Sequence, residues 1–282
     1  MRTFLDKLRE LKQEEVLNRQ KTIKKDHLLS EVNNLEKAPD FRKRLIRNQG
    51  EPISLIVEVK ARAPGRINVN KLEIETLIKE FEHGGAKAIS VLTDQTWFGG
   101  SLSNLENVSK VTKLPLLHKE FIINSYQLLE GRLRGASAAL ILAYYFNQTE
   151  LSKIVTEAED IGLNAVVECS VENELPKVLG VNPDILMINN RPIASIPEEP
   201  NENYEKGSIN VILEWWERYS ELRSWKKQPG KLLISASCIN SPEDVKCILN
   251  IPCDAALIGN AAMKARNRIE FLRSLTEVVN QY

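Results

Sequence analysis

Residues 231–262, KLLISASCINSPEDVKCILNIPCDAALIGNAA, hold the pattern that decides the fold. Two short apolar runs, at residues 231–237 and 254–261, flank a segment that opens with Ser241 and Pro242. Serine is a preferred N-cap residue and proline a preferred first helical residue, so the segment between the runs is predicted to be a helix. A buried strand, a helix and a second buried strand in this order are typical of a parallel sheet.

The same alternation extends from residue 53 to the end of the chain. Six further apolar runs precede this pair, at residues 53–60, 86–94, 114–120, 138–145, 164–170 and 184–190. Amphipathic segments separate several of the runs and one follows the last, at residues 101–111, 124–133, 147–161 and 267–279. Eight buried strands with intervening helices predict an α/β fold, and specifically a closed (β/α)8 TIM barrel. An open doubly wound sheet is the alternative, but no G-x-G-x-x-G motif follows the first run.

Residues 1–48 lie outside this alternation and have the pattern of a charged amphipathic helix. We therefore expect an N-terminal helical extension over residues 1–48 and a barrel over residues 49–282, together forming a single domain. Apolar side chains form a stripe along the extension that we expect to pack across one end of the barrel, namely Phe4, Leu5, Leu8, Leu11 and Val16. An insert around residues 197–227 carries Trp215 and Trp216 in a helical pattern, and we interpret this pair as core packing.

The composition argues against several classes of function. The chain has 282 residues, with 38 Lys plus Arg against 38 Asp plus Glu, so the formal net charge is zero and nothing indicates binding to nucleic acid or to an anionic membrane. No run of 18 apolar residues is present, and the charged start of the chain is unlike a secretory signal. The four cysteines form no C-x-x-C pair and the three histidines are isolated, so we expect reduced thiols and no zinc site. We therefore expect a cytoplasmic protein, and a monomer.

Charged and polar residues gather where the predicted strands end, which is the end that carries the chemistry in such barrels. They are Glu58 and Lys60 in the first run, Lys119 and Glu120 in the third, Glu168 in the fifth, Asn189, Asn190 and Arg191 at the sixth, Ser237 at the seventh, and Gly259 and Asn260 at the eighth. Residues two apart in a strand share a face, so Glu58 and Lys60 point the same way. A barrel opening lined by these residues suits proton transfer on a carbonyl substrate, because it offers both acids and bases. It suits binding of an anionic metabolite equally well.

Small residues after the last two runs point to a phosphate site. The two loops are residues 237–240 (SCIN) and 259–262 (GNAA). Barrels often bind phosphate at these loops through backbone N–H groups, and small side chains let the backbone approach an anion closely. Small residues after strands are common, so these two loops alone are weak evidence for a phosphate site.

Five stretches carry a family resemblance: IVEVKARAPGR (56–66), ISVLTDQTWFGGSLSNL (89–105), LPLLHKEFIIN (114–124), INNRPI (188–193) and ALIGNAAM (256–263). They resemble the indole-3-glycerol phosphate synthase family of tryptophan biosynthesis, and the similarity runs over nearly the whole chain, including the N-terminal helical extension. The resemblance implies a lyase that closes the ring of 1-(2-carboxyphenylamino)-1-deoxyribulose 5-phosphate and removes carbon dioxide and water to form indole-3-glycerol phosphate. It implies a phosphorylated small-molecule substrate and no metal or organic cofactor.

The resemblance also implies roles for four catalytic residues. Lys119 matches the general acid that protonates the ribulose carbonyl, and Glu168 matches the carboxylate that assists proton removal and dehydration. Lys60 matches the lysine that binds the substrate carboxylate, and Glu58 matches the glutamate that orients both lysines. A lysine close to a second cation in a partly dry site is expected to have a depressed pKa.

Binding residues follow from the same resemblance. Asn189 and Arg191 match a polar pair near the substrate, and Phe98 and Phe121 match aromatic side chains that sandwich the anthranilate ring. Pro64 matches a proline in the loop after the first strand. Four residues match phosphate-binding positions, namely Ser237, Cys238, Gly259 and Asn260.

The chain departs from the family pattern in the same region. The family reads A-E-S-G-I after the seventh strand, where this chain reads SASCI at residues 235–239, so Ala236 replaces an acidic residue and Cys238 a glycine. Ala63 and Asn260 each replace a serine. A cysteine keeps the backbone donor of the glycine if its φ is negative, whereas loss of the glutamate removes a charge from the network that sets the lysine pKa values.

Three functions are compatible with these residues. The first is a synthase of the usual reaction. The second is a diverged enzyme acting on a modified anthranilate-type or other sugar-phosphate substrate. The third is a non-catalytic barrel that binds a phosphorylated ligand.

Overall fold

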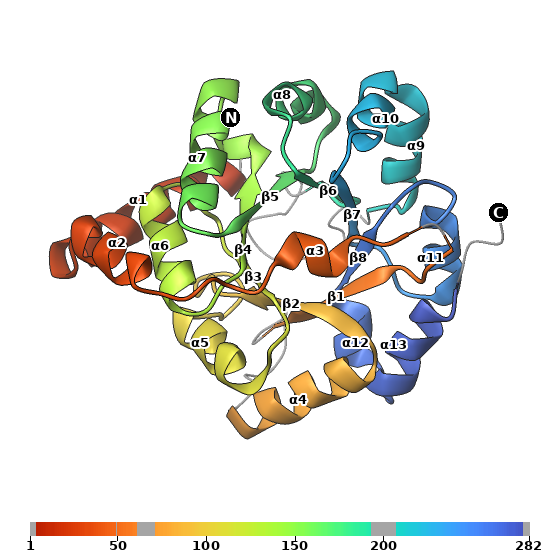
Figure 1. Ribbon diagram of the computed structural model, residues 1–282, viewed down its shortest axis with the longest axis horizontal. Helices are drawn as coiled ribbons and strands as arrows, with labels where there is room; N and C mark the ends of the chain where they lie inside the picture. The colour runs from red at the N-terminus through yellow and green to blue at the C-terminus, as the bar shows by residue number, and fades with distance from the viewer. Residues whose placement is uncertain (1–3, 49, 61–70, 193–206, 279–282) are drawn as a thin grey trace.

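The strands of this protein form a closed barrel. The computed structural model describes residues 4–48, 50–60, 71–192 and 207–278, and only the backbone of residues 71–73. Eight parallel strands of this part pair in chain order, and β1 also pairs with β8 (Figure 1). They are β1 (Ser54–Val59), β2 (Ala86–Leu92), β3 (Leu116–Lys119), β4 (Ala138–Leu142), β5 (Asn164–Cys169), β6 (Ile185–Asn189), β7 (Leu232–Ala236) and β8 (Ala255–Ile258). The predicted TIM barrel is confirmed, and the open sheet is ruled out by the pairing of β1 with β8.

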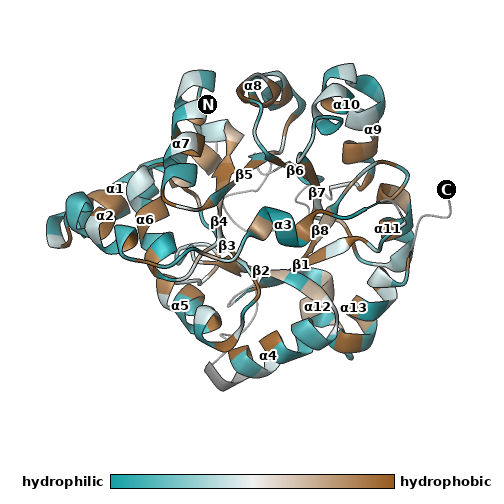
Figure 2. Ribbon diagram, viewed as in Figure 1, coloured by the Kyte–Doolittle hydropathy of each residue, from teal (hydrophilic) through white to brown (hydrophobic). Residues whose placement is uncertain are grey.

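The strands are buried on both faces, as their continuous apolar runs predict. Every residue of β1, β4, β6, β7 and β8 is buried, and these strands are coloured mostly as hydrophobic in Figure 2. One face of each strand packs inside the barrel and the other packs on the ring of helices. The core is therefore continuous from the barrel interior to the inner faces of the helices.

A ring of helices surrounds the barrel, and five of its helices begin within one residue of the positions that the sequence predicts. Its members are α4 (Lys71–His83), α5 (Leu102–Val111), α6 (Ser125–Leu133), α7 (Gln148–Asp160), α8 (Leu175–Val181), α9 (Asn210–Arg218), α10 (Ser220–Lys226), α11 (Pro242–Ile248), α12 (Asn260–Lys264) and α13 (Arg268–Thr276), with two 3-10 turns, η1 (Ala143–Tyr145) and η2 (Glu172–Glu174). Ser241 caps α11 by accepting a hydrogen bond from the backbone N–H of Asp244, and Pro242 is the first helical residue. Trp215 in α9 is buried and Trp216 packs against the core, which confirms core packing for this pair.

Three helices precede the barrel, namely α1 (Phe4–Thr22), α2 (Lys25–Asn33) and α3 (Phe41–Leu45). Helix α2 packs along α6, where Leu28 and Val32 join Tyr126 and Leu129 in a small apolar cluster. Helix α3 covers the end of the barrel at which the strands begin and lies in front of them in Figure 1. Arg42 of α3 donates its backbone N–H to the side chain of Asn164, the first residue of β5. The extension therefore runs along the barrel. The boundary between extension and barrel at residue 48 stays a prediction.

The buried face of α1 differs from the predicted stripe at one position. Phe4, Leu5, Leu8 and Val16 are buried as predicted, but Leu11 is 41% exposed, so its assignment to the stripe is wrong. Lys12 takes its place on the buried face, because it follows Leu8 by four residues and precedes Val16 by four.

Other expectations from composition concern cysteines, metals and membranes. All four cysteines are free thiols, and Cys169 and Cys253 are buried. Within the described residues, no group of His, Cys, Asp and Glu side chains is arranged to hold a metal ion. No helix in the same residues is long and apolar enough to cross a membrane.

Candidate active site

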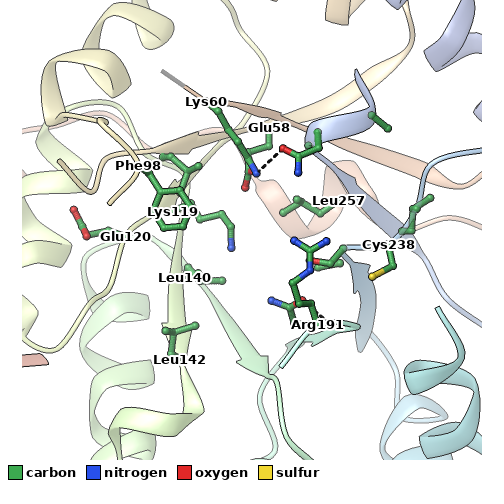
Figure 3. Close-up of a pocket in the computed structure, with 18 of the residues that line it drawn as sticks. Glu58, Lys60, Phe98, Lys119, Glu120, Leu140, Leu142, Arg191, Cys238 and Leu257 are labelled. Atoms are coloured by element: carbon green, nitrogen blue, oxygen red, sulfur yellow. Dashed lines mark hydrogen bonds and ion pairs between the residues drawn. The ribbon is translucent and has the colours of Figure 1, made fainter. Parts of the chain in front are cut away.

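A pocket opens at the ends of the strands, on the side of the barrel that the sequence predicts to carry the chemistry (Figure 3). Many of the residues singled out from the sequence line it, among them Glu58, Lys60, Phe98, Lys119, Glu120, Phe121, Asn189, Arg191, Ala236, Ser237, Cys238, Gly259 and Asn260. Glu168 lies directly behind the lining and contacts two of these residues. Pro64 and Ala63 lie outside the described residues.

Glu58 and Lys60 point the same way from the end of β1, as their spacing predicts. The Nζ atom of Lys60 lies 3.0 Å from Oε1 of Glu58 and donates to Oδ1 of Asn260 at 3.3 Å. Gly259 makes room for this pair, because a Cβ atom there would lie 2.9 Å from Oε1 of Glu58. The second oxygen of Glu58, Oε2, is buried and has no hydrogen-bond partner among the described residues.

A second chain of contacts joins β3, β5 and β6. The Nζ atom of Lys119 lies 3.4 Å from Oε2 of Glu168, and Asn189 donates its Nδ2–H to Oε1 of Glu168 at 3.0 Å. The backbone N–H of Arg191 donates to Oδ1 of Asn189 at 3.1 Å. Glu168 is therefore held from both sides, and its two oxygens contact different partners.

The charge state of Lys119 differs from the expectation. Burial lowers the pKa of the Lys119 ammonium, but the carboxylates of Glu168 and Glu58 outweigh burial, and the net result is a raised pKa. The expected depression of a lysine pKa is therefore wrong for Lys119. The expectation rests on the second cation, Lys60, and neglects the carboxylates of Glu168 and Glu58.

The turn after β7 has an unusual backbone. Ser237 and Cys238 have φ angles of +67° and +62°, a region that residues with a side chain rarely adopt. Asn190 stabilises the turn, since its Nδ2–H group donates to the Oγ of Ser235 at 2.9 Å and to the carbonyl of Ser237 at 3.1 Å. A cysteine at this position is expected to keep the backbone donor of glycine if its φ is negative. The φ of Cys238 is positive, so this cysteine occupies a conformation that favours glycine.

Ala236 ends β7 inside the pocket and is 2% exposed. Four leucines line the same pocket, namely Leu92, Leu140, Leu142 and Leu257. The position at which the family carries a carboxylate is therefore part of a lining that also contains several apolar side chains.

The two aromatic side chains expected to hold a ring lie against each other. Phe98 follows β2 and Phe121 follows β3, and their ring centroids lie 6.1 Å apart with an interplanar angle of 26°. A third ring between them would need a separation of about 7 Å, twice the optimal carbon–carbon contact distance. A sandwich therefore requires the two rings to move apart.

Two residues that support this site were missed from the sequence. Lys12 of α1 is buried at the mouth, and its Nζ lies 2.8 Å from Oδ1 of Asp94 in the loop after β2. The available signal was a lysine in register with the apolar stripe of a helix, where a solvated charge is unexpected. Asp94 closes a predicted strand, but no partner for it was evident, because sequence spacing does not show which residues of the extension reach the mouth.

Comparison with known proteins gives the same family as the motifs. The family model described as indole-3-glycerol phosphate synthase matches residues 5–275. The chain belongs to this family. It is 31% identical over 94% of its length to the indole-3-glycerol phosphate synthase of Desulforamulus reducens, covering 93% of that protein. It is 32% identical over 98% of its length to the same enzyme of Dichelobacter nodosus, covering 98% of that protein. The family consists of carboxy-lyases of tryptophan biosynthesis, and its substrate is a phosphorylated sugar–anthranilate.

Solved structures of other proteins share the fold. A 3-hexulose-6-phosphate synthase from Salmonella typhimurium has a TM-score of 0.59 and 12% identity, with 80% of this chain and 97% of that chain covered. An N-acetylmannosamine-6-phosphate 2-epimerase from Clostridium perfringens has a TM-score of 0.54 and 18% identity, with 81% and 93% covered. At these identities the likeness concerns the barrel alone.

Proposed function

We propose that this chain catalyses the family reaction, the conversion of 1-(2-carboxyphenylamino)-1-deoxyribulose 5-phosphate to indole-3-glycerol phosphate, carbon dioxide and water. The observation that carries the proposal is the pair formed by Lys119 and Glu168, with an ammonium 3.4 Å from a carboxylate at the pocket. An acid and a base side by side can serve successive proton transfers on one substrate.

Lys119 acts as the acid in ring closure. A bond forms between the substrate's ribulose carbonyl carbon and the ring carbon that bears the carboxylate, while the carbonyl oxygen takes a proton from Lys119. Such a positioned acid accelerates the step by roughly 10²–10⁴-fold. The raised pKa of Lys119 keeps the side chain protonated at neutral pH, so the proton is available when the substrate binds.

Loss of carbon dioxide then restores the aromatic ring, and dehydration completes the indole. The new hydroxyl takes a proton from Lys60 and leaves as water, while Glu168 takes the proton lost from the neighbouring carbon. Asn189 supports this role, because its hydrogen bond to Oε1 leaves the carboxylate fixed with Oε2 toward Lys119. A base held in one rotamer needs little reorganisation during proton transfer.

Lys60 binds the carboxylate of the substrate in this proposal, and Glu58 orients Lys60 through the 3.0 Å ion pair. Oε2 of Glu58 is buried and has no hydrogen-bond partner among the described residues. Arg191 lies on the opposite side of the pocket and points toward its centre in Figure 3. The phosphate is bound by the turn of Ser237 and Cys238 and by the loop of Gly259 and Asn260, which contribute backbone N–H groups.

Phe98 and Phe121 bind the anthranilate ring. Because the two rings are stacked with centroids 6.1 Å apart, we propose that the substrate ring either enters between them as the loops move apart or stacks on one of them. In both cases the aromatic surface excludes water from the reacting carbons.

A diverged substrate is the second candidate, and Ala236 is the observation that favours it. A buried alanine beside Leu257 offers an apolar surface where the family has a charge. A substrate with an added apolar group on its ring would fit such a surface better than the ordinary one. A barrel that binds a phosphorylated ligand without turnover is the third candidate.

We further propose that the protein acts in the cytoplasm as a monomer, without a cofactor and without nucleic acid or membrane partners. The zero formal net charge supports the absence of a polyanionic partner.

Growth of a bacterium that lacks its own indole-3-glycerol phosphate synthase tests the proposal in cells. Expression of this chain should restore growth without tryptophan, and expression of Lys119→Met should not. Failure to restore growth by a soluble, folded wild-type protein would support the diverged substrate or the non-catalytic barrel.

A further inference from the structure

Lys12 is a buried lysine outside the reacting groups. It belongs to α1, its side chain is 2% exposed, and three carboxylates surround its Nζ atom. The distances are 2.8 Å to Oδ1 of Asp94, 3.2 Å to Oε1 of Glu120 and 3.0 Å to Oε2 of Glu15. Burial lowers the pKa of Lys12, but the three carboxylates outweigh burial and raise it, so the side chain is a permanent cation. Burial of a charge is costly unless its charged partners are held in good geometry.

Asp94 joins Lys12 to the loop that carries Phe98. One oxygen, Oδ1, pairs with Lys12, and the other, Oδ2, accepts the backbone N–H groups of Trp97 at 2.7 Å and of Phe98 at 3.1 Å. The Asp94 side chain is fully buried. The position of the Phe98 backbone is therefore set by a carboxylate whose own position depends on the ammonium of α1.

Glu120 joins Lys12 to Phe121 in the same manner. Its Oε1 atom accepts the backbone N–H of Phe121 at 2.8 Å and also contacts Lys12, while its Oε2 accepts the hydroxyl of Thr93 at 3.0 Å. Figure 3 shows the carboxylate of Glu120 pointing away from the centre of the pocket, although the residue lines it. Glu120 therefore acts on the backbone behind the pocket.

Helix α1 makes a second, apolar contact with the first of these loops. The ring of Phe4 meets the ring of Trp97 edge to face, with centroids 4.6 Å apart. Trp97 directly precedes Phe98. The helix therefore contacts this loop at two places, one charged and one aromatic.

We propose that Lys12 is a positioning residue for the substrate ring, fixing through Asp94 and Glu120 the two loops that carry Phe98 and Phe121. The effect on catalysis rests on the proposed function, because it requires that these two rings bind the anthranilate. The fixing of the two loops does not rest on the proposed function, because it is a property of the protein without substrate. On this account the extension belongs to the active site, although α1 contributes no reacting group.

Lys12→Met tests the proposal, because methionine keeps the length and apolar stem of lysine and removes the charge. Hydrogen exchange of the substrate-free protein is measured over residues 94–100 and 120–124, and over strand β5 (Asn164–Cys169) as an internal reference. Lys21→Met, an exposed position on the same helix, is the matched control. The amides of Trp97, Phe98 and Phe121 should exchange at least about tenfold faster in Lys12→Met, with β5 unchanged and the control like wild type.

Kinetics give the second readout. A ring that is bound equally in the ground state and in the transition state affects KM, so Lys12→Met should raise KM about tenfold and change kcat by less than about threefold. Unchanged exchange in both loops would overturn the proposal. So would faster exchange that includes β5, because it would assign Lys12 to general stability. If the wild type has no turnover, the proposed function fails while the exchange result still decides the positioning role.

Lys12→Met leaves two buried carboxylates without their cation, which can prevent folding. A second variant, Lys12→Met with Asp94→Asn and Glu120→Gln, removes these charges and keeps one acceptor oxygen at each position. It should fold and show the same fast exchange in the two loops. If neither variant folds, Lys12 serves stability and the positioning role is overturned.

Discussion

The Nζ atom of Lys119 lies 3.4 Å from Oε2 of Glu168, so the proposed acid and the proposed base of this site are partners before any substrate binds. The contact explains why the pKa of Lys119 is raised although the side chain lies in a pocket where burial alone would lower it. A substrate carbonyl that approaches Lys119 must therefore compete with Glu168 for the proton.

Lys119→Met should abolish turnover without unfolding the protein. The substitution removes the proton donor, so kcat should fall by roughly 10²–10⁴-fold, which is the usual contribution of a positioned general acid. The measurement is steady-state kinetics together with the melting temperature. Lys87→Met, at an exposed lysine of β2, is the control and should keep wild-type kinetics. A Lys119→Met enzyme with wild-type kcat would remove this residue from the acid role.

Cys238→Gly should stabilise the protein. Cys238 has a φ of +62°, a region that costs a residue with a Cβ atom about 1 kcal/mol more than glycine, so the free energy of unfolding should rise by about 1 kcal/mol. Urea unfolding measures the change. Cys238→Ala is the control, because it removes the thiol and keeps the unfavourable φ, and it should show no gain. Lower stability of Cys238→Gly would mean that contacts of the thiol outweigh the backbone conformation.

His118 should weaken the fold in acid. Burial, with smaller effects of Lys12 and Arg19, lowers the pKa of this histidine from 6.5 to about 3. Between these values the unfolded chain binds the proton and the folded chain does not, so unfolding takes up protons and stability falls as the pH decreases from about 6.5 toward 3. One such group contributes a slope of up to about 1.4 kcal/mol per pH unit. Buried carboxylates with raised pKa values, such as Glu120, have the opposite effect, because they stabilise the fold as the pH decreases.

The difference between wild type and His118→Gln isolates the histidine in that range. The variant should lose less stability on acidification than the wild type, measured by denaturant unfolding at several pH values. His27→Gln, at an exposed histidine, should follow the wild type. Parallel curves for wild type and His118→Gln would show that His118 titrates normally.

Ala236→Glu should raise activity on the ordinary substrate. The substitution restores a carboxylate where the family has one, beside the end of β6 that carries Asn189. The new charge would support the protonated lysines, and we expect kcat/KM to rise about tenfold. Ala236→Gln has nearly the same size without the charge and should give no gain. If both variants change activity equally, or if neither changes it, the network of charges around the lysines has been rearranged elsewhere.

The barrel and most of the pocket could be predicted from the sequence, because both depend on local patterns. Each buried strand has a continuous apolar run, several helices have a capping residue such as Ser241, and the polar side chains of the pocket lie at or near strand ends. The spacing of Glu58 and Lys60 was enough to place both on one face.

Contacts between distant parts of the chain could not be predicted in this way. Lys12 meets Asp94 and Glu120 only because α1 lies over two particular loops, and no periodicity in residues 1–48 gives that placement. The positive φ of Cys238 follows from the path of the chain after β7, which a cysteine would not suggest. The raised pKa of Lys119 depends on the distances to Glu168 and Glu58, which a sequence does not contain.

The most direct test of the account is to mix the purified protein with 1-(2-carboxyphenylamino)-1-deoxyribulose 5-phosphate and follow indole fluorescence and released carbon dioxide together. The account predicts a steady rise of fluorescence, one carbon dioxide per indole formed, and neither signal with Lys119→Met. Absence of both signals with the wild type, while the substrate still raises its melting temperature, would contradict it and leave a barrel that binds the phosphorylated ligand without this chemistry.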